Sequence, residues 1–478
     1  MIPPAEPGGP LDDTSFAALM AAVGPFEARP LVAVGVSGGS DSMALALLTA
    51  RWASARGGVA HALTVDHGLR PAAADEAATV GRRMARRGIP HAVLRWAGPH
   101  PASGVQAAAR AARLGLLAAW CREHGIVHLL LAHTQDDQAE TVLMRRRRAA
   151  GGPGLVGMAA VSYGRDMRVV RPLLGVSRAS LRATLQALDE GWADDPSNDD
   201  PRYERVRARA KLAGTAGRCD ARARLLALAR RASVKRRTDA AAVDALLGDA
   251  AVIDHAGFVR LSMAAWAGDA SVRRMALAAV LTTVAGASYA PASDALARAV
   301  QAMAQGRSVT LAGCRIVRRA DCWLVVREER AAREERDLIE VPFLWDGRFW
   351  IEATRPAASG LVVRRLGGRG WALIARRVRA HDEARPPFEA LAALPALWNL
   401  DAPAWVPHLR FRQPDEALPA NLAIAFRPRH PLGGAPFVPA GGGPAASLAA
   451  PGPHAKMFAR DRSYHADFGR LSATETAV

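Results

Sequence analysis

Short apolar runs alternate with longer amphipathic stretches in the first part of the chain. The apolar, β-branched runs, which are typical of buried parallel strands, lie at residues 31–36, 59–66, 91–96 and 128–131. The helical periodicity between them predicts helices that start near residue 43 and cover residues 74–87 and 105–124. Strands that alternate with helices predict an α/β fold with a doubly wound parallel sheet. Such sheets bind ligands at the carboxyl ends of their strands.

The rest of the chain changes its pattern several times. We expect a hairpin around residues 163–168, a helix at 177–188, helical structure from 205 to about 285, and a small hairpin at 308–327. The composition therefore predicts five segments. These are an N-terminal extension at residues 1–27, a parallel-sheet domain at 28–212, a mainly helical middle domain at 213–332, a smaller mixed α/β C-terminal domain at 333–432, and a disordered tail at 433–478.

The turn after the first apolar run has the sequence SGGSDS. Its residues are Ser37, Gly38, Gly39, Ser40, Asp41 and Ser42. The two glycines have no Cβ atom, so backbone N–H groups can approach an anion closely. The helix that begins here favours a phosphate at its N-terminus. The turn is therefore a candidate phosphate cradle, although a plain tight turn can have the same composition. It is not the GxxxxGK[ST] loop, because no lysine lies near it.

Acidic residues gather after the fourth apolar run, in the segment LAHTQDDQAET. Asp137 and Glu140 lie three residues apart on a predicted helix and therefore share one face, and His133 precedes them at the strand end. Paired carboxylates beside a phosphate site can bind Mg²⁺ or an amine, or act as a general base. The alternative is a structural role, because acidic residues stabilise helix N-termini. Asp66 and His67 end the second run, where a simple turn is the competing interpretation.

Composition adds an expected class of partner and an expected cellular compartment. The 478-residue chain has a formal net charge of +18, which favours a polyanion such as nucleic acid. GC-rich codon usage is the competing explanation, because only three of the 63 basic residues are lysines. Four cysteines without a CxxC pair suggest a reduced, cytoplasmic enzyme without a zinc or iron–sulfur site. The N-terminus does not resemble a signal peptide, and we expect no membrane span.

Several motifs in register resemble one family of enzymes. In chain order they are SGGSDS, VDHGLRP, AAARAAR, LAHTQDDQAETVLMR, GLVGM, RPLL and DDPSND. Together they resemble the tRNA(Ile)-lysidine synthases, which belong to the PP-loop ATP pyrophosphatases. The resemblance covers residues 31–209 and covers the C-terminal half only loosely. It implies that residues 28–212 form a PP-loop ATP pyrophosphatase domain.

The resemblance implies a two-step reaction on RNA. ATP adenylates the wobble cytidine of the isoleucine tRNA that has a CAU anticodon, and free L-lysine then attacks carbon 2 of the base. AMP and pyrophosphate are released, and the modified base is lysidine. ATP, Mg²⁺, L-lysine and this tRNA are therefore the expected small molecules and partner. A homodimer is compatible with the sequence, which does not determine the oligomeric state.

The resemblance also implies roles for individual residues. The SGGSDS turn would bind the ATP phosphates, with Asp41 also holding Mg²⁺, and Asp66, His67 and His133 would line the nucleotide pocket. Asp137 and Glu140 would hold the lysine amine. Arg113, the second arginine of AAARAAR, would offer a fixed charge to phosphate or to the activated base, although a solvated helix face also explains it.

Two departures from the family pattern concern substrate detail. The family usually has a second histidine and a tyrosine where this chain has Thr134 and Leu114. Three other functions remain open. One is a PP-loop thiolase, although Cys121 is the only cysteine in the expected ATPase domain. Another is a PP-loop amide ligase that acts on a small metabolite. The third is an RNA-binding protein without catalytic activity.

Overall fold

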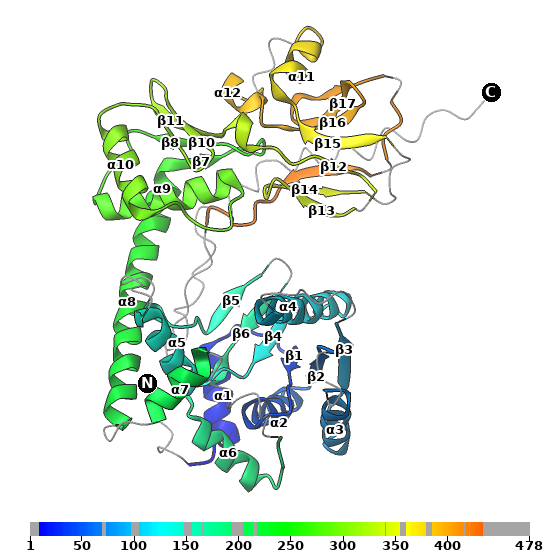
Figure 1. The fold of residues 1–478 in the computed structure, drawn as a ribbon, viewed down its shortest axis with the longest axis vertical. Coiled ribbons are helices and arrows are strands. Elements are labelled where there is room, and N and C mark those ends of the chain that lie inside the picture. Colours follow the sequence, from blue (N-terminus) through cyan, green and yellow to red (C-terminus); the bar gives the residue numbers. More distant parts are fainter. Residues whose placement is uncertain are drawn as a thin grey trace, which may run out of the picture. The chain divides into compact units, whose positions relative to one another are not determined.

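The computed structural model divides into two compact units, which meet in the sequence at residues 238 and 239 (Figure 1). It describes residues 9–68, 73–96, 105–147, 155–164, 167–193, 204–213, 218–339, 341–353, 360–378, 385–414, 416–419 and 421–433. The DDPSND motif and the expected disordered tail lie outside these ranges, apart from residue 433.

The first unit is built on a six-stranded sheet. Its strands are β1 (Leu31–Gly35), β2 (Val59–Asp66), β3 (His91–Arg95), β4 (His128–Leu131), β5 (Val161–Tyr163) and β6 (Arg168–Val170). The strand order is β3-β2-β1-β4-β6-β5, and only β5 runs antiparallel, as the partner of β6 in a hairpin. The chain reverses its direction of winding between β1 and β4, and ligands of such sheets bind at this switch point. The predicted doubly wound sheet is confirmed.

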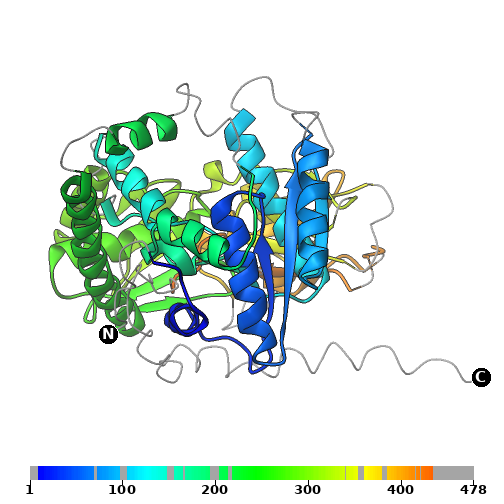
Figure 2. The ribbon, with the colours of Figure 1, turned by 90° about the horizontal axis from the view of Figure 1, so that it is seen from below.

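Helices cover both faces of this sheet. They are α1 (Asp13–Ala22), α2 (Ser40–Ser54), α3 (Ala73–Arg86), α4 (Val105–Glu123) and α6 (Arg178–Ala187). Side chains of β1 alternate between two cores, because successive residues of a strand face opposite sides. Val32 and Val34 pack in one core with α1, α2, α3 and α6, whereas Ala33 packs in the other with Leu117 and Cys121 of α4. Figure 2 shows α2 and α3 side by side along the sheet.

Beyond the sheet come α5 (Gln135–Arg147), the 3₁₀ turn η2 (Pro172–Gly175), α7 (Glu204–Ala213) and α8 (Arg218–Ala250). The helix prediction for residues 205–285 is wrong in part, because a hairpin of β7 (Ala251–Ile253) and β8 (Val259–Ser262) interrupts it. The turn uses the Asp254 carboxylate, which accepts the Ala256 N–H, and Gly257 with φ +81°. The residues on both sides of this turn favour helix, so the composition did not predict the turn.

The second unit starts with a five-stranded sheet of order β7-β8-β11-β10-β9. Its other elements are α9 (Ala270–Ala285), α10 (Ser293–Ala304), β9 (Val309–Leu311), β10 (Cys314–Arg318) and β11 (Cys322–Arg327). The antiparallel pairing of β9, β10 and β11 confirms the hairpin predicted at residues 308–327. Both helices pack on this sheet through one apolar core.

Two antiparallel sheets follow, of orders β12-β15-β16-β17-β18 and β13-β14-β19. Their strands are β12 (Arg336–Asp337), β13 (Phe343–Trp345), β14 (Phe349–Glu352), β15 (Leu361–Arg365), β16 (Pro395–Asn399), β17 (Ala402–Val406), β18 (Phe411–Arg412) and β19 (Ala423–Phe426). The remaining elements are η4 (Glu329–Ala331), α11 (Gly367–Ile374), α12 (Phe388–Leu391) and η5 (Pro407–Leu409). Phe258 and Leu324 share a core with Trp398 and Phe411, so apolar packing crosses the expected domain boundary at residue 333. That boundary stays a prediction.

Within the described ranges, the helices are all too short or too polar to cross a membrane.

Candidate active site

The SGGSDS turn joins β1 to α2 at the carboxyl end of the central strand. Gly38 has φ +86°, a backbone conformation that favours glycine, and a Cβ built on it would lie 3.1 Å from Cγ2 of Val80. Ser42 Oγ donates to the Gly39 carbonyl over 3.0 Å and accepts the Ser37 N–H over 3.1 Å. Because Gly39 is the N-cap and has no side chain, the first amides of α2 are left for an anion.

The predicted carboxylate pair lies on one face of α5, at the carboxyl end of β4. Both side chains are buried, with 8% of Asp137 and 2% of Glu140 exposed. Asp137 Oδ2 accepts the N–H of Thr134 at 2.8 Å and its Oγ1–H at 3.0 Å. Thr134 therefore fixes the carboxylate from the start of the helix. A buried carboxylate requires such partners, because its desolvation is otherwise uncompensated.

One arginine connects the turn to the carboxylate pair. Nε of Arg178, in the first turn of α6, donates to Asp41 Oδ2 at 2.9 Å, and its Nη2 lies 3.4 Å from Asp137 Oδ1. The Arg178 backbone N–H also donates to Asp136 over 2.9 Å. Residues predicted from two separate motifs therefore lie within the span of one guanidinium group.

The two connected carboxyl groups have opposite pKa shifts. Burial raises the pKa of Asp41 above its ordinary value, although Arg178 opposes the shift. Burial acts on Asp137 in the same direction, but Arg205, the Thr134 N–H and Arg178 outweigh it and hold the pKa of Asp137 below its ordinary value. Asp137 is therefore a stable anion at neutral pH.

Helix α7 supplies further partners for the pair. Arg205 Nε and Arg209 Nε contact the two oxygens of Glu140 at 3.0 and 2.9 Å, and Arg205 Nη2 lies 3.3 Å from Asp137 Oδ1. The sequence analysis missed Arg178, Arg205 and Arg209. A signal was present for two of them, because arginines four residues apart share a helical face. The sequence did not reveal which carboxylate this face meets.

Two arginine nitrogens and one imidazole nitrogen lie nearby without such partners. Nε of Arg113, Nε of Arg171 and Nδ1 of His133 are buried and have no hydrogen-bond partner among the described residues. Burial and the charges of Arg110 and Arg205 lower the pKa of Arg113. Burial and Arg110 lower the pKa of Arg171 to about 10. The two Nε–H groups suit a bound anion, since an unpaired buried donor is costly, whereas Nη1 of Arg171 already donates to the Ala159 carbonyl and to Ser162 Oγ.

His133 is neutral in this setting. Burial, with a further contribution from Arg171, lowers its pKa to about 3, although Asp137 acts in the opposite direction. The imidazole can therefore donate and accept hydrogen bonds at neutral pH without carrying charge.

Asp66 and His67 end β2 at the same edge of the sheet. Asp66 Oδ1 accepts the Gly68 N–H at 2.9 Å, and the His67 ring meets the Trp96 ring edge-on at 6.2 Å. These contacts are local, and a role of the two residues in nucleotide binding stays a prediction.

Gln138 holds the GLVGM segment against α5. Its side chain accepts the Met158 N–H at 2.6 Å and donates to the Met158 carbonyl at 2.8 Å. Arg145 donates to the Gly157 carbonyl at 2.7 Å. A Cβ on Gly157 would lie only 2.5 Å from Gln138 Oε1, so this close approach requires glycine. Arg145 therefore also holds this segment, through the protein's own backbone.

Known proteins are similar to this chain in sequence. A family model described as a PP-loop domain matches residues 12–215. The tRNA(Ile)-lysidine synthase of Ruegeria pomeroyi is 37% identical over 386 residues, which cover 78% of this chain and 88% of that protein. The chain belongs to the tRNA(Ile)-lysidine synthase family. The synthase of Hyphomonas neptunium is 42% identical, covering 63% of this chain and 84% of its own. That of Rhodopseudomonas palustris is 48% identical, covering 45% of this chain and 62% of its own.

Membership of the tRNA(Ile)-lysidine synthase family confirms two predictions from the sequence. The first is the PP-loop fold, and the second is that the chain is an enzyme of the ligase class with an ATP-binding domain. The matches to the Ruegeria and Hyphomonas synthases extend well beyond the PP-loop domain.

Proposed function

We propose that the enzyme converts the wobble cytidine of the CAU-anticodon isoleucine tRNA to lysidine. ATP adenylates the cytidine with release of pyrophosphate, and L-lysine then displaces AMP. Asp41, Arg113, Asp137 and Glu140 carry the chemistry in this proposal. The SGGSDS turn, Asp66, His67 and His133 bind the nucleotide.

The single observation that carries the proposal is the span of Arg178 between Asp41 and Asp137. This contact supports the proposal, because a reaction between an activated base and lysine requires the candidate phosphate-binding turn and the candidate amine-binding carboxylates to lie close together. A thiolase or an amide ligase remains the alternative, but neither accounts for two buried carboxylates that both form ion pairs with arginine side chains.

Lysine recognition would be an exchange of cations. Glu140 is occupied by Arg205 and Arg209, both about one-third exposed, so an incoming ammonium group can displace a guanidinium that returns to water. The carboxylate is then never left buried without a partner, which would cost several kcal/mol. A bound lysine that faces Asp137 and Glu140 is held for attack on the adjacent base.

Asp41 fits a magnesium ion as a lone carboxylate ligand. Mg²⁺ in nucleotide sites is commonly held by one or two carboxylates together with substrate phosphates. Among the described residues, no three or more His, Cys, Asp or Glu side chains form a cluster that could hold a metal ion. When bound there, the ion would neutralise phosphate charge during pyrophosphate release. To bind the ion, Asp41 would be ionised and would no longer contact Arg178.

Arg113 and His133 would act on the base during adenylation. The Arg113 guanidinium stabilises negative charge that develops on the cytidine or on phosphate, because it is preorganised and partly dehydrated. The neutral His133 ring contributes a hydrogen bond and adds no repulsion to this cationic cluster.

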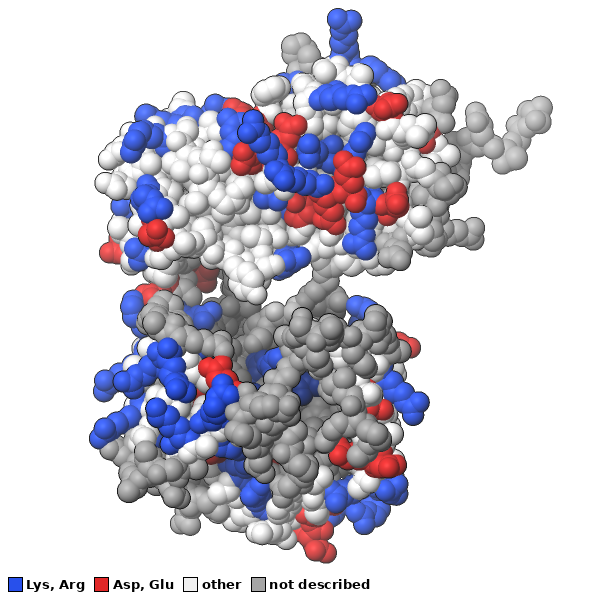
Figure 3. Space-filling model, in the orientation of Figure 1, with Lys and Arg blue, Asp and Glu red and all other residues white. Residues whose placement is uncertain are grey.

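The tRNA would contact the basic surface of α8. Exposed basic side chains follow this helix at Arg224, Arg230, Arg231, Lys235, Arg236 and Arg237. Figure 3 shows Lys and Arg gathered over this part of the first unit. Arginines bind RNA phosphates with release of counterions, so affinity for tRNA falls as salt rises.

The test is to incubate the protein with ATP, labelled lysine and total tRNA. We expect label in the CAU-anticodon isoleucine tRNA alone, with one AMP and one pyrophosphate released per label. Asp41→Asn should remove both products, and Ser37→Ala should do the same with the fold retained. Release of ADP and phosphate, or label in a small metabolite, would contradict the proposal.

A further inference from the structure

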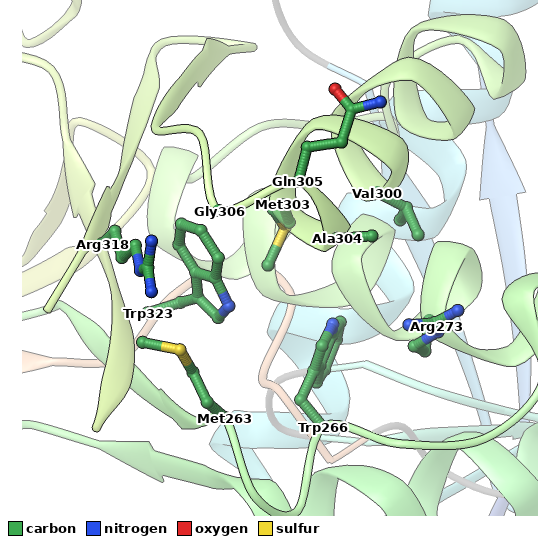
Figure 4. A pocket seen from close by; sticks show the side chains of 10 residues that line it. All are labelled: Met263, Trp266, Arg273, Val300, Met303, Ala304, Gln305, Gly306, Arg318 and Trp323. Atoms are coloured by element: carbon green, nitrogen blue, oxygen red, sulfur yellow. The ribbon is translucent and has the colours of Figure 1, made fainter. Parts of the chain in front are cut away.

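A cavity of about 460 Å³ lies in the second unit (Figure 4). The indole rings of its lining, Trp266 and Trp323, are only 7% and 4% exposed and belong to the apolar core of that unit. They offer no ring surface to a ligand. The feature that extends the candidate active site lies in the first unit instead, directly after α6.

The segment that follows α6 returns to the SGGSDS turn. It has the sequence DEGWA at residues 189–193 and is called the strap below. The Ala193 N–H donates to the Gly38 carbonyl at 2.9 Å, and a Cβ built on Gly39 would lie 3.9 Å from the Ala193 carbonyl oxygen. Trp192 packs, partly buried, against the core of the first unit. The strap therefore contacts both glycines of a turn that is distant in sequence.

Arginines at the end of α3 hold the strap in place. Only 4% of the Glu190 side chain is exposed, and its two oxygens lie 2.9 Å from Arg87 Nε and 3.7 Å from Arg86 Nη2. Arg83 Nη1 donates to the Gly191 carbonyl over 2.9 Å. A carboxylate as buried as Glu190 requires cationic partners, so these contacts fix where the strap lies.

The same face of α3 also meets the turn itself. Val80, Arg83 and Arg87 lie three and four residues apart and therefore share one helical face. A Cβ built on Gly38 would lie 3.1 Å from Val80 Cγ2. Helix α3 thus supports the turn directly through Val80 and indirectly through the arginines that hold the strap.

The hydrogen bond from Ala193 fixes the direction of one peptide group of the turn. The peptide bond between Gly38 and Gly39 is trans, and in a trans peptide the C=O and N–H groups point in opposite directions. The Gly38 carbonyl points at the strap, so the Gly39 N–H points away from it. Because a glycine lies on each side of this peptide, no Cβ restricts its rotation, and an outside contact is needed to hold it.

We propose that the strap is a positioning element for ATP, which holds the Gly39 N–H toward the phosphates. Ala193 sets the direction of the peptide group, and Glu190 keeps Ala193 in place. Both act through the turn and not by touching the nucleotide. The competing interpretation is a purely structural connection between α6 and α3. The inference rests on the proposed function, in which the SGGSDS turn binds the ATP phosphates.

The test uses the full chain and measures ATP affinity by calorimetric titration, together with the KM values of ATP and lysine. Ala193→Pro removes the donated N–H, and because Ala193 is exposed, no buried side chain is lost. ATP affinity should fall about tenfold, and the KM of ATP should rise to match, because a charge-assisted hydrogen bond to phosphate is lost. Ala193→Ser keeps the N–H and is the matched control, with ATP affinity equal to wild type.

A second pair of variants tests the anchor of the strap. Glu190→Leu should raise the KM of ATP severalfold, whereas Glu190→Gln keeps an acceptor for Arg87 Nε and should recover most of the affinity. The KM of lysine should stay unchanged in all four variants. General weakening of α6 would raise both KM values, because Arg178 in the first turn of that helix contacts Asp137.

The outcomes separate this inference from the proposed function. Wild-type ATP affinity in both Ala193→Pro and Glu190→Leu, with a loss in Gly38→Ala, overturns the inference alone. Wild-type affinity in Gly38→Ala overturns the assignment of the turn to phosphate and the inference with it. Equal rises in the two KM values support the structural connection and overturn the inference as well. If Ala193→Pro does not fold, the comparison of Glu190→Leu with Glu190→Gln decides.

Discussion

Glu140 and Asp137 are the residues through which lysine binding can be tested separately from ATP chemistry. Glu140→Gln removes a charge-assisted contact worth about 1.5–3 kcal/mol, so the lysine KM should rise about 10- to 100-fold. Adenylation of the tRNA should persist, because the ion pairs that Glu140 makes with described residues are with Arg205 and Arg209 of α7 and not with groups at the phosphate-binding turn. The measurement follows adenylated tRNA and lysidine separately. Glu123→Gln, at the exposed end of α4, is the control.

If Glu140 held metal instead, adenylation itself would fail and excess Mg²⁺ would partly restore it. Loss of the first step in both Glu140→Gln and Asp137→Asn would therefore reject the assignment to lysine.

Burial of the neutral His133 ring should make the folding stability depend on pH. Its folded pKa of about 3 lies below the ordinary value of 6.5, so between these values the unfolded chain binds a proton that the folded protein does not. Folding stability is therefore lost as pH falls from 6.5 toward 3. From pH 7.5 to 5.0 this residue alone should cost about 2 kcal/mol. Denaturant unfolding of His133→Asn should show a smaller loss over that interval than wild type.

His124→Asn serves as the matched control, because His124 is exposed at the end of α4. An equal pH dependence in wild type and His133→Asn would show that His133 is not buried in its neutral form.

The β1–α2 turn permits a comparison between two glycines. Gly38→Ala and Gly88→Ala both force a side chain into the left-handed region, at a cost of about 1–2 kcal/mol each. Nothing lies within 4 Å of a Cβ on Gly88, whereas one on Gly38 meets Val80. Both variants should lose similar thermal stability, but only Gly38→Ala should lose ATP affinity in calorimetric titration. Unchanged affinity in Gly38→Ala would argue against the turn as the phosphate site.

The elements that the sequence predicts correctly are those whose pattern lies within one short stretch of the chain. The SGGSDS turn and the carboxylates of α5 follow directly from strand-to-helix patterns. Arg178 could not be assigned in this way, because its partner Asp41 lies far away in the chain and their contact depends on the packing of α6 against α2. The β7–β8 hairpin was missed for another reason. Alanine, arginine and leucine favour helix on both sides of it, and the turn at Gly257 overrides them.

The division of the whole molecule at residues 238 and 239 predicts how it can be truncated. All the candidate catalytic residues lie before this point. A protein ending at residue 238 should bind ATP with near-normal affinity but bind tRNA more weakly, because it lacks the second unit. A protein ending at residue 332 should lose solubility, since it exposes Phe258 and Leu324 of a shared core. Thermal unfolding and filter binding of both proteins check this, and equal tRNA affinity of full and shorter chains would contradict it.

Arginine provides the cations identified around the candidate site, at Arg113, Arg171, Arg178, Arg205 and Arg209. Under the proposed reaction, the presence of arginine in place of lysine at these positions has a chemical consequence. An adenylated cytidine is an electrophile that awaits an amine, and a lysine side chain nearby would be a rival to the substrate. Guanidinium groups keep their protons and do not act as nucleophiles. The site can therefore surround the reactive intermediate with positive charge while none of these arginines attacks it in place of the substrate lysine.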